Sequence, residues 1–311
     1  MTANNAVSPR AIDRIPPHAY FVVSALFHYL GPSFAVLLFA AIEPLGVAWL
    51  RIASAAIVFA LWRRPLRYLR RAAARERWLI VAMAATLAAM NGCFYLAIDR
   101  LPLATVGAIE FLGPIGLAAL GLTGTFSAAA GIGSASKARP ARRRQRNFVA
   151  LSLAIAGVWM LTDARWVAEP VGYLYAFANC GLFVLYVVLG HRLAAQGGAG
   201  GIERLAAAML VATVFALPFG IEQAMPAFRD PLLLGAGIGI GISSSVIPYV
   251  CDQLAMARLP RATFALMLAL LPATAALIGI AVLRQIPTHA EMIGIALVIA
   301  GVALHRAERE H

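Results

Sequence analysis

The chain carries ten apolar runs, each close to the length that crosses a membrane. A hydrocarbon core of roughly 30 Å needs about 20 apolar residues in a helix. Hydrophobic side chains make up 61% of the 311 residues and charged ones only 13%, whereas a soluble domain usually carries about 25% charged residues. The runs therefore predict an all-α membrane protein with ten transmembrane helices. They cover residues 19–39, 44–62, 78–98, 102–122, 147–163, 171–190, 204–221, 231–254, 262–283 and 290–305.

One segment of the sequence recurs about half a chain later. Residues 100–105 read Arg-Leu-Pro-Leu-Ala-Thr, and residues 258–263 read Arg-Leu-Pro-Arg-Ala-Thr, a spacing of 158. Pro114 and Pro272 follow at the same offset. An internal repeat indicates that the chain contains the same structural unit twice. The fifth run is short and nine spans is the alternative count, but ten gives each copy five spans, so the second copy enters the membrane from the opposite side. We expect two inverted five-helix repeats.

The distribution of basic residues predicts the orientation, because cytoplasmic loops of membrane proteins are enriched in Lys and Arg. With the N-terminus inside, 21 of the 26 Lys and Arg residues fall on the cytoplasmic side. We expect both termini in the cytoplasm, and the protein in a bacterial inner membrane. The net charge of +12 is then a consequence of topology and not a sign of nucleic-acid binding.

The expected domain organisation follows from the spans and the repeat. Residues 1–146 hold spans one to four and a basic cytoplasmic linker, 147–169 hold span five, and 170–311 form the second repeat. The linker, residues 123–146, is rich in Gly, Ser, Ala and Arg, and we expect it to be mobile. Its alternative role is contact with anionic lipid head groups. The loop at residues 63–77 carries seven Arg and one Glu.

Few polar side chains fall inside the spans, where ionisable groups are costly and usually face a cavity or a partner. At about 1.5 Å per residue, Arg51, Asn91 and Glu110 share one layer about 10 to 12 Å below the outer surface. We expect Arg51 to pair with Glu110, since each relieves the other's buried charge, and Asn91 to bond to either. The alternative is a purely structural salt bridge. The candidates for substrate or proton binding are Glu110, Arg51, Asn91, His28, Asn179, Tyr95 and Phe111.

For the remaining candidates, the sequence allows both a functional and a purely structural role. His28 is a proton relay or only donates to a nearby carbonyl, and Asn179 binds substrate or joins helices. Other aromatic side chains line a cavity or only pack. These are Tyr29, Phe94 and Tyr249.

Four prolines inside the expected spans predict helix kinks: Pro32, Pro114, Pro248 and Pro272. A proline lacks the N–H that bonds the carbonyl four residues earlier, so the carbonyls of His28, Glu110 and Ser244 lose their helical donors. In span eight, Gly237 and Gly241 have the spacing that favours close helix packing. The alternative for the serines at 243–245 is a hinge or cavity wall.

Several motifs resemble the drug/metabolite transporter superfamily and, within it, the EamA-like threonine and homoserine exporters. They are Gly46 to Arg51, Asn91-Gly-Cys-Phe-Tyr95, Pro102-Leu103, Ala108 to Pro114 with its Glu-Phe-Leu-Gly-Pro, Pro248-Tyr249 and Arg258 to Phe264. The resemblance implies export of small amino acids or related metabolites, driven by the proton gradient. Similar exporters often carry two further Glu residues around span nine, where this chain has Leu271 and Gln285.

The sequence thus predicts a secondary transporter whose halves rock around a midplane site. Glu110 is expected to alternate between a protonated form and a form paired with Arg51 or a substrate ammonium, which couples protons to export. The expected partners are a small-molecule substrate, protons and the bilayer, with a homodimer left open and no cofactor or metal. Export or import of other small or lipophilic metabolites or drugs is the alternative, and a nontransporting sensor or scaffold is a remote one. No hydrolase or metalloprotease motif occurs, so an enzyme is not expected.

Overall fold

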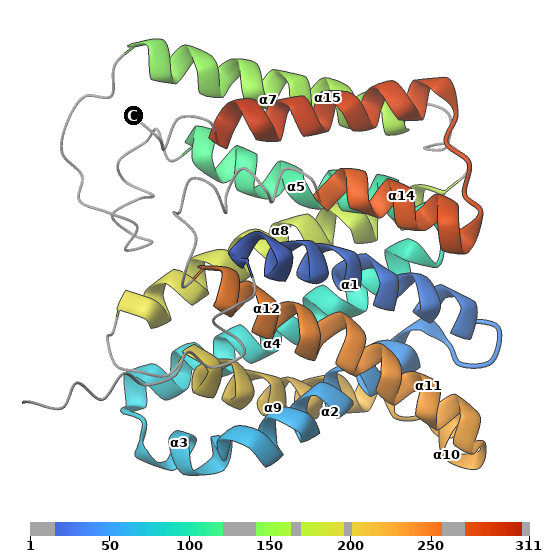
Figure 1. The fold of residues 1–311 in the computed structure, drawn as a ribbon. Helices are drawn as coiled ribbons and strands as arrows, with labels where there is room; N and C mark the ends of the chain where they lie inside the picture. Colours follow the sequence, from blue (N-terminus) through green and yellow to red (C-terminus); the bar gives the residue numbers. More distant parts are fainter. Residues whose placement is uncertain (1–15, 121–140, 163–168, 196–200, 257–270, 307–311) are drawn as a thin grey trace, which may run out of the picture.

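The computed structural model describes residues 16–120, 141–162, 169–195, 201–256 and 271–306, which are helical apart from short connections (Figure 1). This confirms the all-α prediction. The elements are α1 (Pro17–Leu38), α2 (Pro44–Arg63), α3 (Pro65–Arg71), α4 (Ala74–Ile98), α5 (Leu103–Leu120), α7 (Ala141–Thr162), α8 (Pro170–Ala195), α9 (Gly201–Gly220), α10 (Met225–Arg229), α11 (Pro231–Gly241), the π-helical turn η2 (Ile242–Val246), α12 (Ile247–Met256), α14 (Leu271–Leu283) and α15 (His289–Arg306).

The long helices coincide with the expected spans. Among the described residues, six helices are long and apolar enough to cross a membrane: His18–Leu38, Pro44–Arg63, Ala74–Ile98, Pro170–Gly190, Gly201–Gly220 and Pro231–Cys251. Three expected spans appear as shorter apolar helices, Phe148–Met160, Leu271–Leu283 and His289–Gly301, and α5 lies within the run at 102–122. Residues 262–270 lie outside the described part of the chain. The protein is therefore a multi-pass membrane protein, and the count of ten spans stays a prediction.

Two connections contain helices that hydropathy did not indicate, α3 and α10. At the end of α2, Arg64 has a left-handed backbone with φ of 51°, and its N–H donates to the Ala60 carbonyl. This cap ends α2 and turns the chain into α3. The expected linker, residues 123–146, overlaps the start of α7, which begins at Ala141, and its role as a linker stays a prediction. Residues 141–146 are therefore helical, and residues 121–140 lie outside the described residues.

Helices from the first half of the chain pack mainly against helices from the second half. These pairs include α7 with α15, α4 with α8 and α9, α2 with α9, α1 with α12 and α14, and α5 with α8 and α14. Small residues allow the backbones to meet in the α7–α15 pair, which lies at one edge of the bundle in Figure 1. A Cβ atom on Gly301 would lie 2.7 Å from the Ala150 carbonyl oxygen. Such contact is typical of helix pairs in membranes.

The bundle has two distinct ends. The short helix α3 and the start of α7 lie at one end, and α10 and the connection between α14 and α15 lie at the other (Figure 1). The first end holds the seven arginines of residues 63–77, and we call it the arginine-rich end. The positive-inside pattern predicts that this end faces the cytoplasm.

Candidate functional site

Arg51 lies in the middle of α2 and is only 7% exposed. A buried guanidinium needs partners for its donors, because an unpaired charge in a low-dielectric interior is costly. The Nε atom of Arg51 donates to the Ser245 hydroxyl at 3.0 Å, and an Nη atom donates to the Ser244 carbonyl at 3.1 Å. The cation of the first half is therefore held by η2 of the second half.

Pro248 explains why η2 offers this acceptor. The Ser244 carbonyl lacks its helical donor because the proline four residues later has no N–H, and the backbone widens into a π-helical turn just before it. Such turns are frequent at functional sites. This carbonyl, which the sequence predicts to lack its helical donor, accepts a hydrogen bond from Arg51. Whether the four prolines kink their helices stays a prediction.

Close packing of span eight against α2, which the glycine spacing predicts, is also confirmed. A Cβ atom on Gly241 would lie 2.7 Å from the Arg51 carbonyl oxygen, and one on Gly237 would lie 2.9 Å from the Leu50 Cδ1 atom. Because neither glycine has a side chain, η2 and α2 come close enough for the Arg51 hydrogen bonds to form.

Glu110 lies in α5 and is also 7% exposed. Its carboxylate accepts a hydrogen bond from the Asn179 amide of α8 at 3.4 Å. The expected ion pair with Arg51 is wrong, because no ion pair joins these two described residues. Arg51 directs two of its N–H groups to η2, and Glu110 has the neutral Asn179 as its partner. Both charges are thus buried but not directly bonded to each other.

Three buried polar atoms near these charges have no hydrogen bond among the described residues: the hydroxyls of Tyr29 and Tyr95 and the Oδ1 atom of Asn179. A Cβ atom on Gly107 would lie 3.2 Å from the Tyr29 hydroxyl, and Gly107 is one helical turn before Glu110. The Arg51 guanidinium lies 5.6 Å from the centre of the Tyr95 ring. Unpartnered buried polar groups are rare and call for an explanation. We define the central polar cluster as Tyr29, Arg51, Tyr95, Glu110, Asn179, Ser244 and Ser245.

Two other predicted site residues behave differently. Asn91 is 4% exposed, but its amide donates to the Leu87 carbonyl of its own helix at 2.8 Å, so the expected bond to Arg51 or Glu110 is wrong. His28 is partly buried and packs edge-on against Tyr29, with 5.3 Å between ring centres. Within the described residues it makes no hydrogen bond, neither to a carbonyl nor to a relay partner.

For the remaining predicted positions, the described residues show no hydrogen bond to the central polar cluster. The side chains of Phe111 and Pro114 lie outside the described residues. Pro32 is buried within the continuous helix α1, and Pro272 is the second residue of α14. The described residues contain no group of His, Cys, Asp and Glu that could hold a metal ion.

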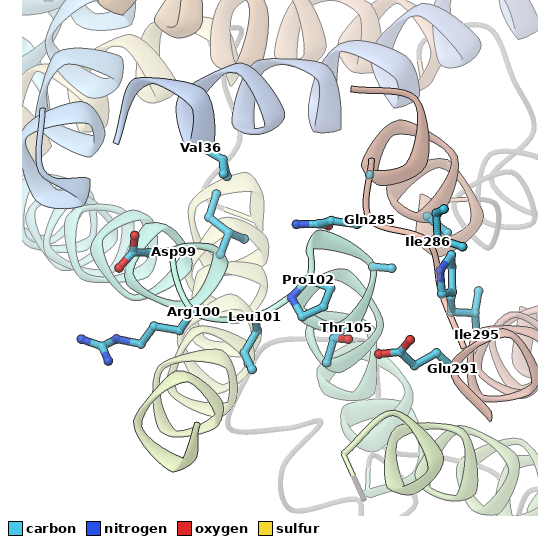
Figure 2. Close-up of a pocket in the computed structure, with 15 residues that line it drawn as sticks. Val36, Asp99, Arg100, Leu101, Pro102, Thr105, Gln285, Ile286, Glu291 and Ile295 are labelled. Atoms are coloured by element: carbon cyan, nitrogen blue, oxygen red, sulfur yellow. The ribbon is translucent and has the colours of Figure 1, made fainter. Parts of the chain in front are cut away.

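A cavity of about 310 Å³ lies at the end opposite the arginine-rich end, between the start of α5 and the α14–α15 connection (Figure 2). Gln285 lines it and accepts a hydrogen bond from the Leu103 N–H at 3.1 Å, at the start of α5. Glu291 caps α15 by accepting from the Thr288 N–H at 2.7 Å. Thr105, beside Glu291 in Figure 2, lies on the same helix as Glu110, about 7.5 Å away along its axis. Five residues also correspond to about 140° around the helix axis, so the cavity and Glu110 lie beside different faces of α5.

The sequence indicated most of these residues but not how they meet. It placed Arg51, Glu110 and Asn179 in the spans, and it singled out Ser244 only through Pro248. The signal for the Arg51 partners was the combination of three consecutive serines with a proline, which creates several acceptors on one turn.

Comparisons with known proteins fit this architecture. Residues 170–306 match the EamA-like transporter family. The threonine/homoserine exporter RhtA of Escherichia coli K12 and that of Salmonella typhimurium LT2 are each 28% identical over 273 residues, 87% of this chain and 84% of the exporter. A protein of known crystal structure aligns over 94% of this chain and 99% of its own with a TM-score of 0.56 and 19% identity, so it shares the fold. Residues 170–306 are therefore similar to the EamA-like transporter family, and most of the chain is similar to the RhtA exporters.

Proposed function

We propose that this chain exports small amino acids, with threonine and homoserine as the first candidates, in exchange for protons. One observation carries the proposal: Arg51 and Glu110 are both buried between the two halves, and neutral groups hold each of them. A cation and an anion that do not bond to each other suit a ligand that carries both charges. The names of the RhtA relatives point to the same class of ligand.

The polarity of the cluster matches a zwitterion. An amino acid's carboxylate would bind the Arg51 guanidinium, which pairs well with planar anions. Its ammonium would bind the Glu110 carboxylate and the free Oδ1 atom of Asn179. The hydroxyls of Tyr29 and Tyr95 then remain for the side-chain hydroxyl of threonine or homoserine. A site built to bond a substrate hydroxyl rejects analogues that lack it.

The contact pattern supports two five-helix repeats. If the repeats pair α1 with α8, α2 with α9, α4 with the α11–α12 span, α5 with α14 and α7 with α15, exchanging them turns many of the contacts between described helices into other observed contacts, whereas α2–α4 and α5–α15 have no counterpart of similar extent. The α1–α12 contact becomes the α8–α4 contact, and α1–α14 becomes α8–α5, all of which occur. The α2–α9, α5–α14 and α7–α15 contacts map onto themselves. Inverted repeats of this kind move against each other around a midplane site.

Proton coupling is assigned to Glu110. In the export step, the carboxylate is charged and bound to the substrate ammonium. After release at the far end, Glu110 takes up a proton, which removes the buried charge that no substrate then balances. The protonated carrier returns to the arginine-rich, cytoplasmic end and loses the proton there. One proton thus enters for each amino acid that leaves.

The test uses the purified full chain in proteoliposomes with radiolabelled threonine. We expect a pH gradient to drive threonine movement by the unmodified protein, and the Glu110→Gln variant to lose this pH dependence. Glu222→Gln is the matched control, because Glu222 is exposed and outside the cluster. Full, pH-dependent transport by Glu110→Gln would contradict the proton assignment. Unchanged amino acids in the growth medium of expressing cells would point to another substrate class.

A further inference from the structure

A second cavity, of about 300 Å³, lies at the arginine-rich end. Four arginines, Tyr68 and two glutamates line it. It is formed by the end of α2, by α3 and by the first turns of α4 and α9. None of its residues belongs to the central polar cluster. Arg63 lies twelve residues after Arg51 on α2, which is about 18 Å along the helix.

The carboxylates of this cavity are already paired. Glu76 accepts from the Nε atom of Arg204 at 3.0 Å and also from the Tyr68 hydroxyl. Burial and the bond to Glu76 raise the pKa of the Tyr68 hydroxyl above its usual value, so it keeps its proton and donates. Glu203 accepts from Arg63 at 3.5 Å. The negative charge inside the cavity is therefore balanced before any ligand binds.

The other three arginines of the cavity keep their charge available. Among the described residues, no ion pair or hydrogen bond engages the side chains of Arg64, Arg67 and Arg71. Arg64 is fixed at the junction of α2 and α3 by its left-handed backbone. Arg67 and Arg71 are one helical turn apart, so they lie on the same face of α3. Together they offer several N–H donors to one anion.

Apolar side chains on the same two helices are strongly exposed. Leu61 is 83% exposed, Leu66 is 60% exposed and Trp62 is 50% exposed. The Arg63 guanidinium lies over the Trp62 ring, 4.3 Å from its centre, which links the apolar surface to the cavity. Tryptophan beside arginine is typical of the membrane interface. A ligand at this place would meet cations at its head and apolar surface along its tail.

We propose that this cavity binds the phosphate head group of an anionic phospholipid through Arg64, Arg67 and Arg71, with the acyl chains against Leu61, Trp62 and Leu66. A soluble phosphate compound would use the same arginines but not the exposed apolar surface. A lipid bound here bridges α2 and α3 to α9, because Glu203 and Arg204 of α9 hold the inner wall of the cavity. The bound lipid would stabilise the arginine-rich end of the bundle. This is the end at which α2, the helix that carries Arg51, joins α3.

The experiment titrates the full chain in mild detergent with dioleoylphosphatidylglycerol or dioleoylphosphatidylcholine and counts bound lipids by native mass spectrometry. We expect tighter binding of phosphatidylglycerol. The Arg67→Gln/Arg71→Gln variant should bind it about thirtyfold more weakly, because each basic residue near an anionic head group contributes about a factor of five in affinity. Arg75→Gln/Arg77→Gln is the matched control, because it removes two exposed arginines of the same stretch that do not line the cavity. The control should change the affinity less than twofold.

Three outcomes would overturn the inference. Equal binding of the two lipids would show no anion preference, and equal loss in both double variants would mean that only overall charge matters. In a third arm, inorganic phosphate at millimolar concentration competes with the lipid on the unmodified protein. Complete displacement there would assign the cavity to a soluble anion. This arm needs no variant, so it decides the question even if a substitution impairs folding.

Discussion

Arg51 donates to the backbone carbonyl of Ser244 at 3.1 Å, and this bond ties the middle of α2 to the π-helical turn of the other half. A carbonyl is a neutral acceptor, so it orients the guanidinium without cancelling its charge. Glu110 is left with Asn179 as its partner. The two charges of the central polar cluster thus stay available to a third group, which a direct ion pair would have prevented.

The hydroxyl of Ser245 should matter more than that of Ser243. In Ser245→Ala, the Nε atom of Arg51 loses its acceptor, and leaving a buried charged donor unpaired costs about 1 to 3 kcal/mol. Ser243→Ala only removes a bond to the Ile240 carbonyl within the same helix and should cost less. Thermal unfolding in detergent and threonine transport in proteoliposomes measure both effects. Equal effects of the two variants would mean that Arg51 does not depend on Ser245.

Removing the hydroxyl of Tyr29 or Tyr95 should affect substrate selectivity more than protein stability. Because the Tyr29 hydroxyl has no hydrogen bond among the described residues, Tyr29→Phe should leave the free energy of unfolding within about 1 kcal/mol or raise it. Tyr95→Phe also removes a hydroxyl that lies close to Arg51 and Ser244. If these hydroxyls contact a substrate hydroxyl, transport of threonine should fall relative to 2-aminobutyrate, which lacks it. The ratio of the two initial rates is the measurement. An unchanged ratio in both variants would remove the tyrosines from the proposed site.

The sequence predicted the helical spans well because membrane crossing is a local property. Each span needs about 20 apolar residues wherever it packs, so runs such as 44–62 and 204–221 coincide with α2 and α9 within a few residues. The free Ser244 carbonyl was also predictable, since it depends only on Pro248. The short helices α3 and α10 were not, because they are too short and too polar for a hydropathy signal.

Partner choice inside the cluster could not be predicted from span depth alone. Depth placed Arg51, Asn91 and Glu110 in one layer, but depth does not fix which face of each helix meets which neighbour. Asn91 bonds back to Leu87 on its own helix, and Arg51 bonds to residues of η2 about 190 positions away. These pairings depend on how the two halves pack, which hydropathy does not encode.

Gly241 is predicted to be the most sensitive glycine of span eight. In Gly241→Ala, the new Cβ atom would lie 2.7 Å from the Arg51 carbonyl oxygen, so η2 and α2 must separate. Overpacking of this kind costs about 1 to 3 kcal/mol, and it would lengthen the Arg51 bonds to η2. Gly239→Ala is the matched control, because a Cβ atom there meets no heavy atom within 4 Å. The thermal midpoint should fall in the first variant and stay or rise in the second, and a reversed order would contradict the close packing.

Two ion pairs at the arginine-rich end should differ in their contribution to stability. Glu76 and Arg204 are 3.0 Å apart, with side chains only 15% and 11% exposed, and Tyr68 shares the carboxylate. Glu203 and Arg63 are 3.5 Å apart and about one third exposed. Removing one member of a largely buried, shared pair leaves a charge unbalanced, whereas exposed pairs contribute about 0 to 1 kcal/mol. Glu76→Gln should therefore lower the free energy of unfolding, measured by denaturant titration in detergent, by more than Glu203→Gln does. High salt should weaken the Glu203 contribution further, because exposed pairs are screened. Equal losses in the two variants, at low salt and at high salt, would mean that burial does not distinguish the two pairs.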